Sequence, residues 1–334
     1  MGTLVASPPV CDFSSDAPSI NCLPDVFASC CATSSPPLPA GVHHFVARFA
    51  SVPGGPGTHL LTAYWLSGMY HKSETYGMED DSAMPVLALV NRKGGVGKST
   101  VCVNLAACLA ERGERVLVCD LDPQAAATFH LGVDYTQQPS LLDVLQGDRS
   151  IAEVVLPTRH GVDLAPSSPF LVNAETQLLQ VAGCERLFAE QLEAASIDYG
   201  WILLDTPPSL GILTLSGLGA ADVVLIVATP EFASVEAVGQ TMETIAVVRR
   251  RLNQKLRLLG VIANRVEARV RSVDEVCRRI QGLGVPLLAS RVRKTVRLAD
   301  AFGFQEPILT FDPRHPVCND IRDLTEEVVR LASS

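Results

Sequence analysis

The sequence predicts an α/β protein in which a parallel β-sheet is covered by helices on both faces. Three observations lead to this prediction. From residue 84 onward, short apolar runs alternate with longer segments of helical periodicity, an order typical of parallel sheets. The apolar runs are continuous, as in strands that are buried on both sides. A glycine-rich turn joins the first run to the first helical segment, so the fold begins in the order strand, loop, helix.

Each element follows from the same reasoning, taken in chain order. Val86–Val90 is a run of apolar residues and is expected to form a central strand. The segment Ser99–Arg112 has apolar residues at helical spacing, and Gly113 is a suitable C-terminal stop. Further buried strands are expected at Val116–Cys119, Trp201–Leu204, Val223–Val227, Leu258–Ala263 and Pro286–Leu288. Helical segments near Ala174–Ala195, Val235–Leu252, Val273–Gly282 and Asp320–Leu331 fall between or after them.

Residues 1–83 differ from the rest of the chain. They are rich in Pro, Ser and Cys, nearly free of Lys and Arg, and show no sustained period. We interpret them as a low-complexity, irregular and disordered extension, and residues 84–334 as the folded domain. Because Met84-Pro85 opens directly onto the first strand, one hypothesis is that the natural start lies at Met84 or Met78. An intact-mass measurement on natively expressed protein would decide this.

Composition argues against several classes of protein. No uncharged apolar run approaches the roughly 18–20 residues needed to span a bilayer, and the N-terminus lacks the pattern of a secretory signal. None of the ten cysteines forms a CxxC pair, so buried free thiols in a reducing cytoplasm are expected. The C-terminal segment is acidic, and an anionic membrane would repel it. We therefore expect a cytoplasmic protein with no membrane partner.

The overall charge of −9 conceals one strongly basic segment. Residues 249–297 hold 14 basic and 3 acidic side chains, a net charge of +11, whereas residues 85–248 carry a net charge of −11. A segment of this kind is a candidate for contact with the phosphate groups of nucleic acid.

The loop after the first predicted strand reads NRKGGVGKST, residues 91–100. Its glycines and the start of the following helix would aim several backbone N–H groups at one point, which makes an anion site. Lys98 is expected to reach the β- and γ-phosphates of a nucleotide, and the Ser99 hydroxyl to bind Mg²⁺. The first glycine of the usual GxxxxGK[ST] pattern is replaced by Arg92, and a second lysine, Lys93, follows it. The residues expected to bind nucleotide here are Gly94, Gly95, Val96, Gly97, Lys98, Ser99 and Thr100.

Three carboxylates follow two of the predicted strands. Asp120 and Asp122 end the segment RVLVCDLD, and Asp205 ends WILLD. Alternation along a strand would put Asp120 and Asp122 on the same side, and the carboxyl ends of parallel strands meet at one edge of a sheet. We expect these carboxylates to converge on the glycine loop, with Asp205 and Asp120 near Mg²⁺ and Asp122 positioning or activating water.

The loop and the two acidic segments together resemble the motifs of the ParA/MinD-type ATPases. The deviant Walker A motif KGGxxK[ST] is followed by DLDPQ and LLDTPPS, in the order that this family has. The resemblance covers about residues 85–334 and is closest to ParA/Soj-like partition ATPases. It implies a P-loop NTPase-like fold and an ATP-bridged homodimer that requires Mg²⁺.

The resemblance also implies roles for single residues. In that family the early lysine reaches the partner's phosphates, which implies a catalytic role for Lys93 in trans, beside Lys98 and Asp122 in cis. Asn264 matches a position at which the family often contacts adenine through an amide. Pro230 and Glu231 follow another strand end and are candidates for lining the base pocket. Turn-forming residues are the alternative interpretation for Asn264 and Pro230.

Within the basic segment, RVRKTVRLADAF resembles the stretch that contributes to DNA contact in chromosome- and plasmid-partitioning ATPases. The candidates are Arg291, Arg293, Lys294 and Arg297, with support possible from Arg249, Arg250, Arg251, Arg269, Arg271, Arg278 and Arg279. Contacts with phosphates carry no sequence information, so the expected DNA binding is non-specific and weakened by salt. Residues 1–83 lack the helical period and basic charge of a helix-turn-helix, so no operator binding is expected.

The sequence therefore predicts a nucleoid-associated partition ATPase that binds MgATP, dimerises and coats DNA non-specifically. Its hydrolysis would be slow until a ParB-type centromere-binding partner stimulates it. Two alternatives stay open. The same ATPase could position a non-DNA cargo or a division component, or the chain could be a nucleotide switch with negligible turnover.

Overall fold

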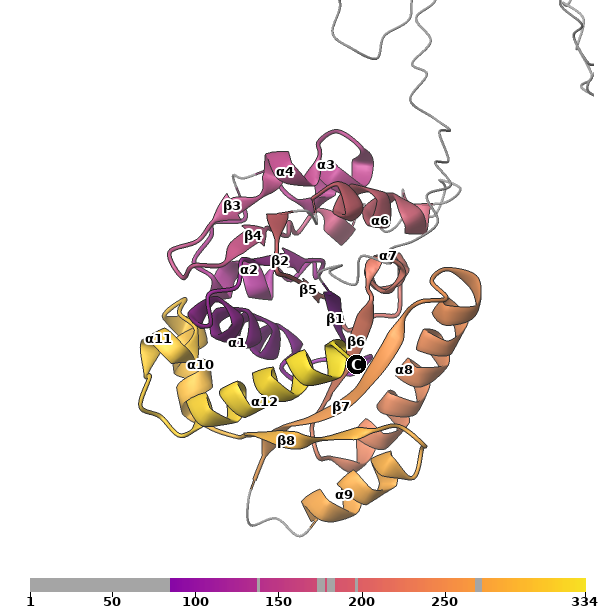
Figure 1. Ribbon diagram of the computed structural model, residues 1–334, viewed down its shortest axis with the longest axis vertical. Coiled ribbons are helices and arrows are strands. Elements are labelled where there is room, and N and C mark those ends of the chain that lie inside the picture. Colours follow the sequence, from indigo (N-terminus) through magenta and orange to yellow (C-terminus); the bar gives the residue numbers. More distant parts are fainter. Residues whose placement is uncertain (1–84, 137–138, 173–177, 179–183, 196–197, 268–271) are drawn as a thin grey trace, which may run out of the picture. The chain divides into compact units, whose positions relative to one another are not determined.

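The computed structural model describes residues 85–334, apart from residues 137–138, 173–177, 179–183, 196–197 and 268–271. Its described part contains an eight-stranded sheet in the order β3-β4-β2-β5-β1-β6-β7-β8 (Figure 1). The strands are β1 (Val86–Val90), β2 (Val116–Asp120), β3 (Leu156–Pro157), β4 (Asp163–Ala165), β5 (Trp201–Asp205), β6 (Val223–Ala228), β7 (Arg257–Val266) and β8 (Leu287–Arg293). Only β3 runs antiparallel to its neighbour within this sheet. The predicted parallel α/β fold is confirmed.

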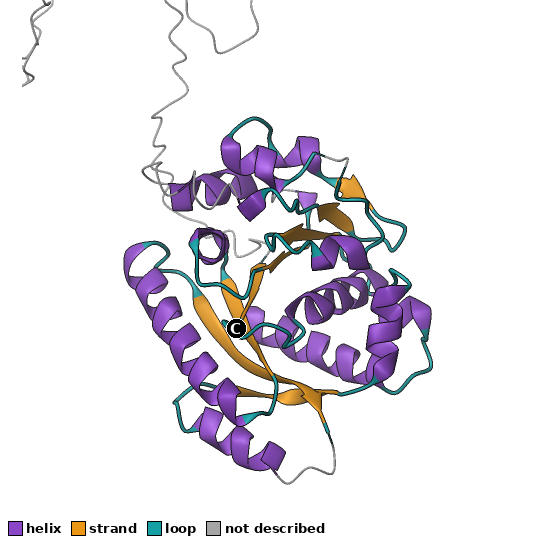
Figure 2. Cartoon of the chain, turned by 180° about the vertical axis from the view of Figure 1, so that it is seen from behind, coloured by secondary structure: helices purple, strands orange, loops and turns teal. Residues whose placement is uncertain are grey.

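Helices cover both faces of the sheet (Figures 1 and 2). One core joins the sheet to α1 (Lys98–Glu111), α2 (Ala126–His130), α10 (Val296–Gly303), α11 (Ile308–Phe311) and α12 (Val317–Ala332). The other joins it to α3 (Leu141–Gln146), α4 (Ile151–Val154), α6 (Cys184–Ala195), α7 (Ile212–Ala220), α8 (Phe232–Arg251) and α9 (Ser272–Gln281). Within the described ranges, no helix combines the length and apolar character needed to cross a membrane.

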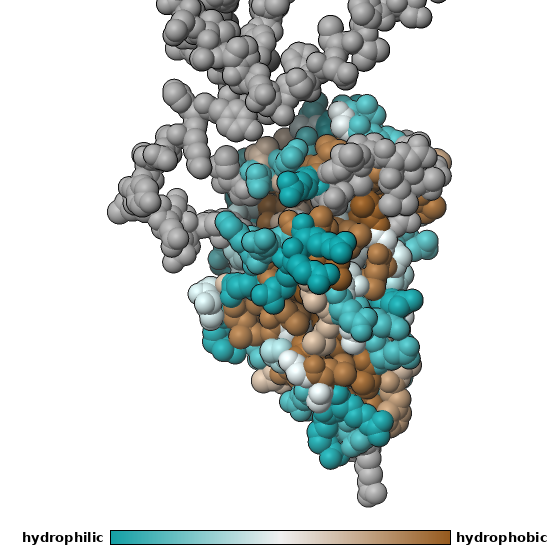
Figure 3. Space-filling view, turned by 90° about the vertical axis from the view of Figure 1, so that its right-hand side faces the viewer, coloured by the Kyte–Doolittle hydropathy of each residue, from teal (hydrophilic) through white to brown (hydrophobic). Residues whose placement is uncertain are grey.

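The central strands are continuous apolar runs because both of their faces are covered. Every residue of β1 is buried, with Leu87 and Leu89 in the core under α1 and Ala88 and Val90 in the core under α8. Burying one such side chain contributes roughly 1.5–3 kcal/mol. The outer side of α8 and α9 faces the viewer in Figure 3, where hydrophilic residues separate the apolar ones. A strand buried on both faces has only apolar residues, whereas a surface helix mixes apolar and polar ones. The apolar run of β1 therefore marks its bounds in the sequence.

The edges of the sheet differ from the sequence prediction. The strand expected at Pro286–Leu288 runs instead from Leu287 to Arg293, because only one of its faces is buried and exposed arginines interrupt its apolar pattern. Strands β3 and β4 are too short to give a periodic signal. The helix expected from Val235 begins at Phe232. Part of the helix expected at Ala174–Ala195, and the extension predicted for residues 1–83, lie outside the described residues.

Two carboxylates of α12 bind the backbone of the edge strand β8. Glu327 accepts hydrogen bonds from the N–H groups of Ala289 and Ser290, at 2.9 and 2.8 Å. Asp320 accepts one from the Arg293 N–H at 3.0 Å. Both carboxylate side chains are only 11% exposed. The acidic character of the last helix therefore has a structural use at this edge.

Candidate functional site

The glycine loop lies between β1 and the start of α1. Gly95 and Gly97 have φ angles of +72° and +90°, and Gly97 is the residue that precedes the helix. A side chain at Gly97 would be strained and would also place its Cβ 2.5 Å from the amide nitrogen of Asn264. The loop thus presents the N-terminus of a 14-residue helix, with its unpaired N–H groups, at the C-terminal edge of the sheet. This is the anion-binding geometry that the sequence predicts.

Asn264 supports this loop from β7. Its Nδ2 donates to the Val96 carbonyl oxygen at 2.7 Å, and its Oδ1 accepts from the Arg265 N–H at 2.9 Å. Asn264 is buried, and both ends of its amide are therefore engaged within the protein. Any contact with a base would use the remaining capacity of this amide, so its expected adenine role stays a prediction.

Lys98 is a buried cation at the centre of the site. The residue is only 6% exposed, and its Nζ donates to the Asn91 carbonyl oxygen at 3.4 Å. Burial lowers the pKa of Lys98, and the nearby carboxylates of Asp205 and Asp122 oppose that shift. A phosphate group bound to the loop would give this ammonium group an anionic hydrogen-bond partner in place of the water that it lost on burial.

Asp205 lies next to Asp120 across the sheet, because β5 and β2 pair with these two residues in register. It is fully buried, and among the described residues neither of its carboxylate oxygens makes a hydrogen bond. Burial raises the pKa of the Asp205 carboxyl well above its ordinary value, and Asp120 raises it further. Ser99 and Lys98, which lie nearby, favour the charged form. A buried carboxylate without partners beside a hydroxyl fits a site for a hydrated divalent cation.

Asp120 is fully engaged inside the protein. One of its oxygens accepts from the Thr128 N–H at 2.8 Å and from the Thr128 hydroxyl at 2.7 Å, and the other accepts from the Asp122 N–H at 3.1 Å. These bonds fix the start of α2 against the end of β2. Burial raises the pKa of Asp120, and the hydrogen bonds from Thr128 oppose the shift. The expected metal contact of Asp120 stays a prediction.

Asp122 lies in a turn and not on the strand. Strand β2 ends at Asp120, and the Ala125 N–H donates to the Asp122 carbonyl oxygen at 2.8 Å. The predicted position of Asp122 on the strand was therefore wrong. Burial raises the pKa of the Asp122 carboxyl, and the hydrogen bond from the Gln124 N–H and the nearby Lys98 oppose that shift. Its carboxylate accepts from the Gln124 N–H at 2.9 Å, so the backbone holds its orientation.

A cavity of about 460 Å³ opens beside the loop. Its wall is contributed by Gly95, Gly97, Thr100, Asn264, Arg265, Arg293, Lys294, Thr295, Val296, Leu298, Ala299 and Phe302. Pro230 does not line this cavity but lies with Glu231 in a neighbouring smaller one. The size and the mixed polar and apolar lining of the larger cavity are typical of a small-molecule site. The basic segment predicted to contact DNA thus also forms part of the wall beside the phosphate loop.

Lys93 makes an ion pair within its own chain. Its Nζ lies 2.5 Å from Glu231 Oε2, at the start of α8. Arg92, which replaces the first glycine of the usual motif, donates to the Gln240 side chain of the same helix at 2.8 Å. The beginning of the loop is therefore held against α8.

The four residues predicted to contact DNA also form ion pairs. Arg293 binds Asp320 through two nitrogens at 2.6 Å each, and Lys294 lies 2.6 Å from Glu267. The remaining pairs join Arg291 to Asp274, and Arg297 to both Asp300 and Asp312. All four basic side chains are at least 38% exposed. The charges of these four side chains are therefore neutralised locally by neighbouring carboxylates.

Sequence reasoning missed two residues of this site. Thr128 holds Asp120, but it is eight residues away and no spacing rule connects them. Arg265 has a φ of +59° and donates to the Gly95 carbonyl oxygen at 2.9 Å. Its place directly after Asn264, at the end of a predicted strand, was the signal that could have identified it.

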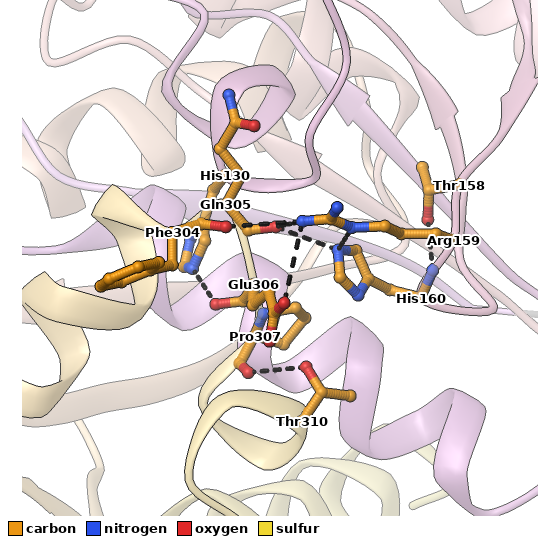
Figure 4. A network of polar contacts seen from close by, with 9 residues as sticks. All are labelled: His130, Thr158, Arg159, His160, Phe304, Gln305, Glu306, Pro307 and Thr310. Carbon is orange, nitrogen blue, oxygen red and sulfur yellow. Dashed lines mark hydrogen bonds and ion pairs between the residues drawn. The ribbon is translucent and has the colours of Figure 1, made fainter.

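A polar network joins α2 to the segment after α10 (Figure 4). His130 is fully buried, and its Nε2 donates to the Glu306 carbonyl oxygen at 3.0 Å. Its Nδ1 has no hydrogen-bond partner among the described residues. Arg159 donates to the Gln305 carbonyl oxygen at 3.0 Å. Burial lowers the pKa of His130 to about 4, so its ring is neutral at pH 7.

Comparisons with known proteins agree with this geometry. The family model described as an AAA domain matches residues 84–258. The chain is 34% identical over 249 residues to the sporulation initiation inhibitor protein Soj of Bacillus subtilis, covering 73% of this chain and 97% of Soj. It is also 34% identical over 249 residues to the chromosome partitioning protein ParA of Caulobacter vibrioides, covering 73% of this chain and 93% of that protein.

Two solved structures show the same fold. Cobyrinic acid a,c-diamide synthase from Mycobacterium smegmatis, with bound ATP analogue and magnesium, is 32% identical with a TM-score of 0.67, covering 74% of this chain and 95% of that one. The septum site-determining protein MinD of Pyrococcus horikoshii, complexed with Mg-ADP, is 25% identical with a TM-score of 0.62, covering 74% of this chain and 97% of that one.

Proposed function

The chain belongs to the ParA/MinD-type ATPases, and from this premise we propose that it is a partition ATPase. It binds MgATP, forms a homodimer around two nucleotides and binds DNA non-specifically. Hydrolysis is slow until a ParB-type partner stimulates it, and it releases the protein from DNA. The observation that carries the proposal is the meeting of Lys98, the glycine loop and the unpartnered Asp205 at one edge of the sheet.

The residues present fit ATP and Mg²⁺. The phosphates would lie on the N–H groups of the loop, with Lys98 at the β- and γ-phosphates. Ser99 and Asp205 would hold Mg²⁺, Asp205 through a water molecule. Among the described residues no three His, Cys, Asp or Glu side chains could hold a metal ion together, so its other ligands would be phosphate and water oxygens. Bound there, Mg²⁺ would offset the charge of the phosphates.

In this proposal Asp122 orients the attacking water. Its carboxylate is held by the Gln124 N–H and lies near Lys98. An oriented carboxylate would accept a hydrogen bond from the water that attacks the terminal phosphate. The cavity beside Gly97, whose wall includes Asn264, would take the adenine base.

The 291–297 segment supplies the DNA contacts in this proposal. Since its four basic side chains already have carboxylate partners, DNA phosphates must compete with those carboxylates. The net affinity of one protomer is then low, and dimerisation doubles the number of contacts. This gives ATP a means of controlling DNA binding without any group that reads a base.

Phosphate release measured with plasmid DNA, with and without the cognate ParB-type protein, tests the function. We expect low turnover alone and a marked increase when DNA and partner are both present. Lys98→Ala is the negative control, because it removes the cation under the phosphates. No stimulated turnover in any combination would favour the alternative of a nucleotide switch.

The DNA surface has a separate test. Lys294→Gln should weaken binding equally for all sequences and reduce the slope of log K against log salt by about one per protomer. Lys255→Gln, an exposed lysine in the same basic region, is the matched control. Arg293 is less suitable, because its removal would leave Asp320, which is 11% exposed, without its cation. DNA retention unchanged in Lys294→Gln would count against this surface.

The similarity to MinD favours one alternative within the family. The same ATP-driven cycle could position a non-DNA cargo or a division component. Both versions share the nucleotide site and differ in the partner. Stimulation of hydrolysis by the candidate partner without any centromere DNA would favour the alternative.

A further inference from the structure

The backbone of Lys93 is attached to the sheet through the side chain of Asn91. The Lys93 N–H donates to Asn91 Oδ1 at 2.8 Å, and Asn91 Nδ2 donates to the Val227 carbonyl oxygen at 2.6 Å. These two bonds attach the lysine to the end of β6. Rotation of the side chain can therefore move the ammonium group without breaking these two hydrogen bonds.

The ammonium group is held by Glu231. The residue precedes α8, yet its side chain does not cap that helix. Instead its carboxylate lies 2.5 Å from Lys93 Nζ, and this hydrogen bond lowers the pKa of Glu231. The side chains are 27% and 63% exposed for Lys93 and Glu231, so the pair is accessible to another molecule. An exposed pair of this kind is weak enough to be exchanged.

The other cations near Glu231 have partners of their own. Arg265 lies close enough to lower the pKa of Glu231, but its guanidinium donates to the Gly95 carbonyl oxygen at 2.9 Å. Lys294, which lines the same small pocket as Glu231, pairs with Glu267 at 2.6 Å. Lys93 is therefore the cation that Glu231 holds among the described residues. A triphosphate from a second subunit carries more negative charge than one carboxylate, so it can displace Glu231 from this ammonium.

We propose that Glu231 is a positioning residue that holds Lys93 within its own protomer until the partner's nucleotide takes its place. The inference rests on the proposed ATP-bridged dimer and on the role in trans that the family resemblance implies for Lys93. Glu231 keeps the ammonium away from the phosphates of its own subunit, and the exchange occurs twice in each dimer. Each dimer therefore forms at the expense of two ion pairs.

Dimerisation of the full chain with a non-hydrolysable ATP analogue, measured by sedimentation equilibrium, tests the exchange. Glu231→Gln removes the competing charge and should tighten the dimer about two- to thirtyfold, as expected for two exposed ion pairs. Affinity of the monomer for nucleotide should not change. Glu231→Asp, which keeps the charge, should fall between the variant and the wild type. Glu243→Gln, which changes an exposed glutamate within α8, is the matched control and should behave as the wild type.

A second measurement observes the pair directly. The chain has only five lysines, so acylation of each can be followed by mass spectrometry. Without nucleotide, Lys93 should react faster in Glu231→Gln than in the wild type, with Lys255 as internal reference. An equal rate would overturn the pairing, and a dimer no tighter in Glu231→Gln would overturn the exchange. If the wild-type chain never dimerises with the analogue, both the proposed function and the exchange are overturned. If the wild type dimerises and Glu231→Gln dimerises equally well, only the exchange is overturned.

Discussion

At the scale of single residues, the site buries ionisable side chains that have few hydrogen-bond partners in their own protomer. Lys98 donates only a 3.4 Å hydrogen bond to a carbonyl oxygen, and the buried Asp205 makes no hydrogen bond among the described residues. Burying such groups costs free energy unless a partner arrives. We infer that the nucleotide-free chain is less stable than its core would allow, and that ligand binding recovers the difference.

Asp205→Asn tests this inference. The amide removes a buried carboxyl whose charged form lacks partners, so the nucleotide-free variant should unfold at the same or a higher temperature than the wild type. The gain in melting temperature on adding MgATP should shrink, because the variant no longer offers a carboxylate to the hydrated metal. Thermal unfolding with ATP alone and with MgATP measures both effects. An undiminished Mg²⁺-dependent gain would contradict the assignment of Asp205.

At the scale of elements, the glycine loop depends on its distance from β7 as much as on its own conformation. Gly97→Ala should cost about 1–2 kcal/mol for the left-handed backbone and should also displace Asn264, since its Cβ would lie 2.5 Å from that amide. We expect nucleotide binding to be lost, as measured with a fluorescent ATP analogue.

Gly113→Ala is the matched control for that variant. Gly113 has nearly the same φ, +91°, and no atom lies within 4 Å of the position its Cβ would take. It should lose similar stability and still bind nucleotide. Equal loss of binding in both variants would show that instability alone is responsible.

Helix α2 connects the end of β2, beside the glycine loop, to the segment after α10. Thr128 of this helix binds Asp120, and His130 binds the Glu306 carbonyl oxygen. Burial lowers the pKa of His130 from 6.5 to about 4. Between these values the unfolded chain binds a proton that the folded chain does not, so stability falls as the pH falls through this window. The shift corresponds to on the order of 3 kcal/mol between pH 7 and pH 4.

Urea unfolding of the wild type and His130→Gln across this pH range isolates the effect. The glutamine amide can still donate to the carbonyl oxygen but does not titrate. The wild type should lose more stability on acidification than the variant. Subtracting the two pH profiles cancels the contributions of other titrating groups, such as His160, which both proteins share. Parallel pH profiles would contradict the buried, neutral state of His130.

The elements that the sequence predicted well are those whose environment is uniform. Strands β1 and β5 are buried on both faces, so their apolar runs coincide with their bounds to within a residue. The extent of β8 could not be predicted because arginines occupy its exposed positions. The site's motifs were visible because phosphate binding needs glycines and a lysine at fixed spacing. The hydrogen bonds of Thr128 and the ion pair of Lys93 with Glu231 join distant segments, and no local pattern encodes them.

At the scale of the whole molecule, the two lysines of the loop divide the work between two subunits in our proposal. Lys93→Ala should leave ATP binding by the monomer largely intact, because Lys98 provides the cation for the bound phosphates. The ATP-dependent dimer should be lost, as judged by light scattering after size-exclusion chromatography. Lys255→Ala, another exposed lysine, should dimerise normally. A normal dimer in Lys93→Ala would refute the assignment in trans.

The carboxylates of α12 that bind the backbone of β8 have a further consequence. An edge strand with free N–H groups is a template for strand addition by another chain. Glu327 and Asp320 occupy three such groups, those of Ala289, Ser290 and Arg293, and so act in place of a ninth strand. Shortening the chain before α12 would uncover this edge, and the resulting protein would be prone to polymerise through its sheets.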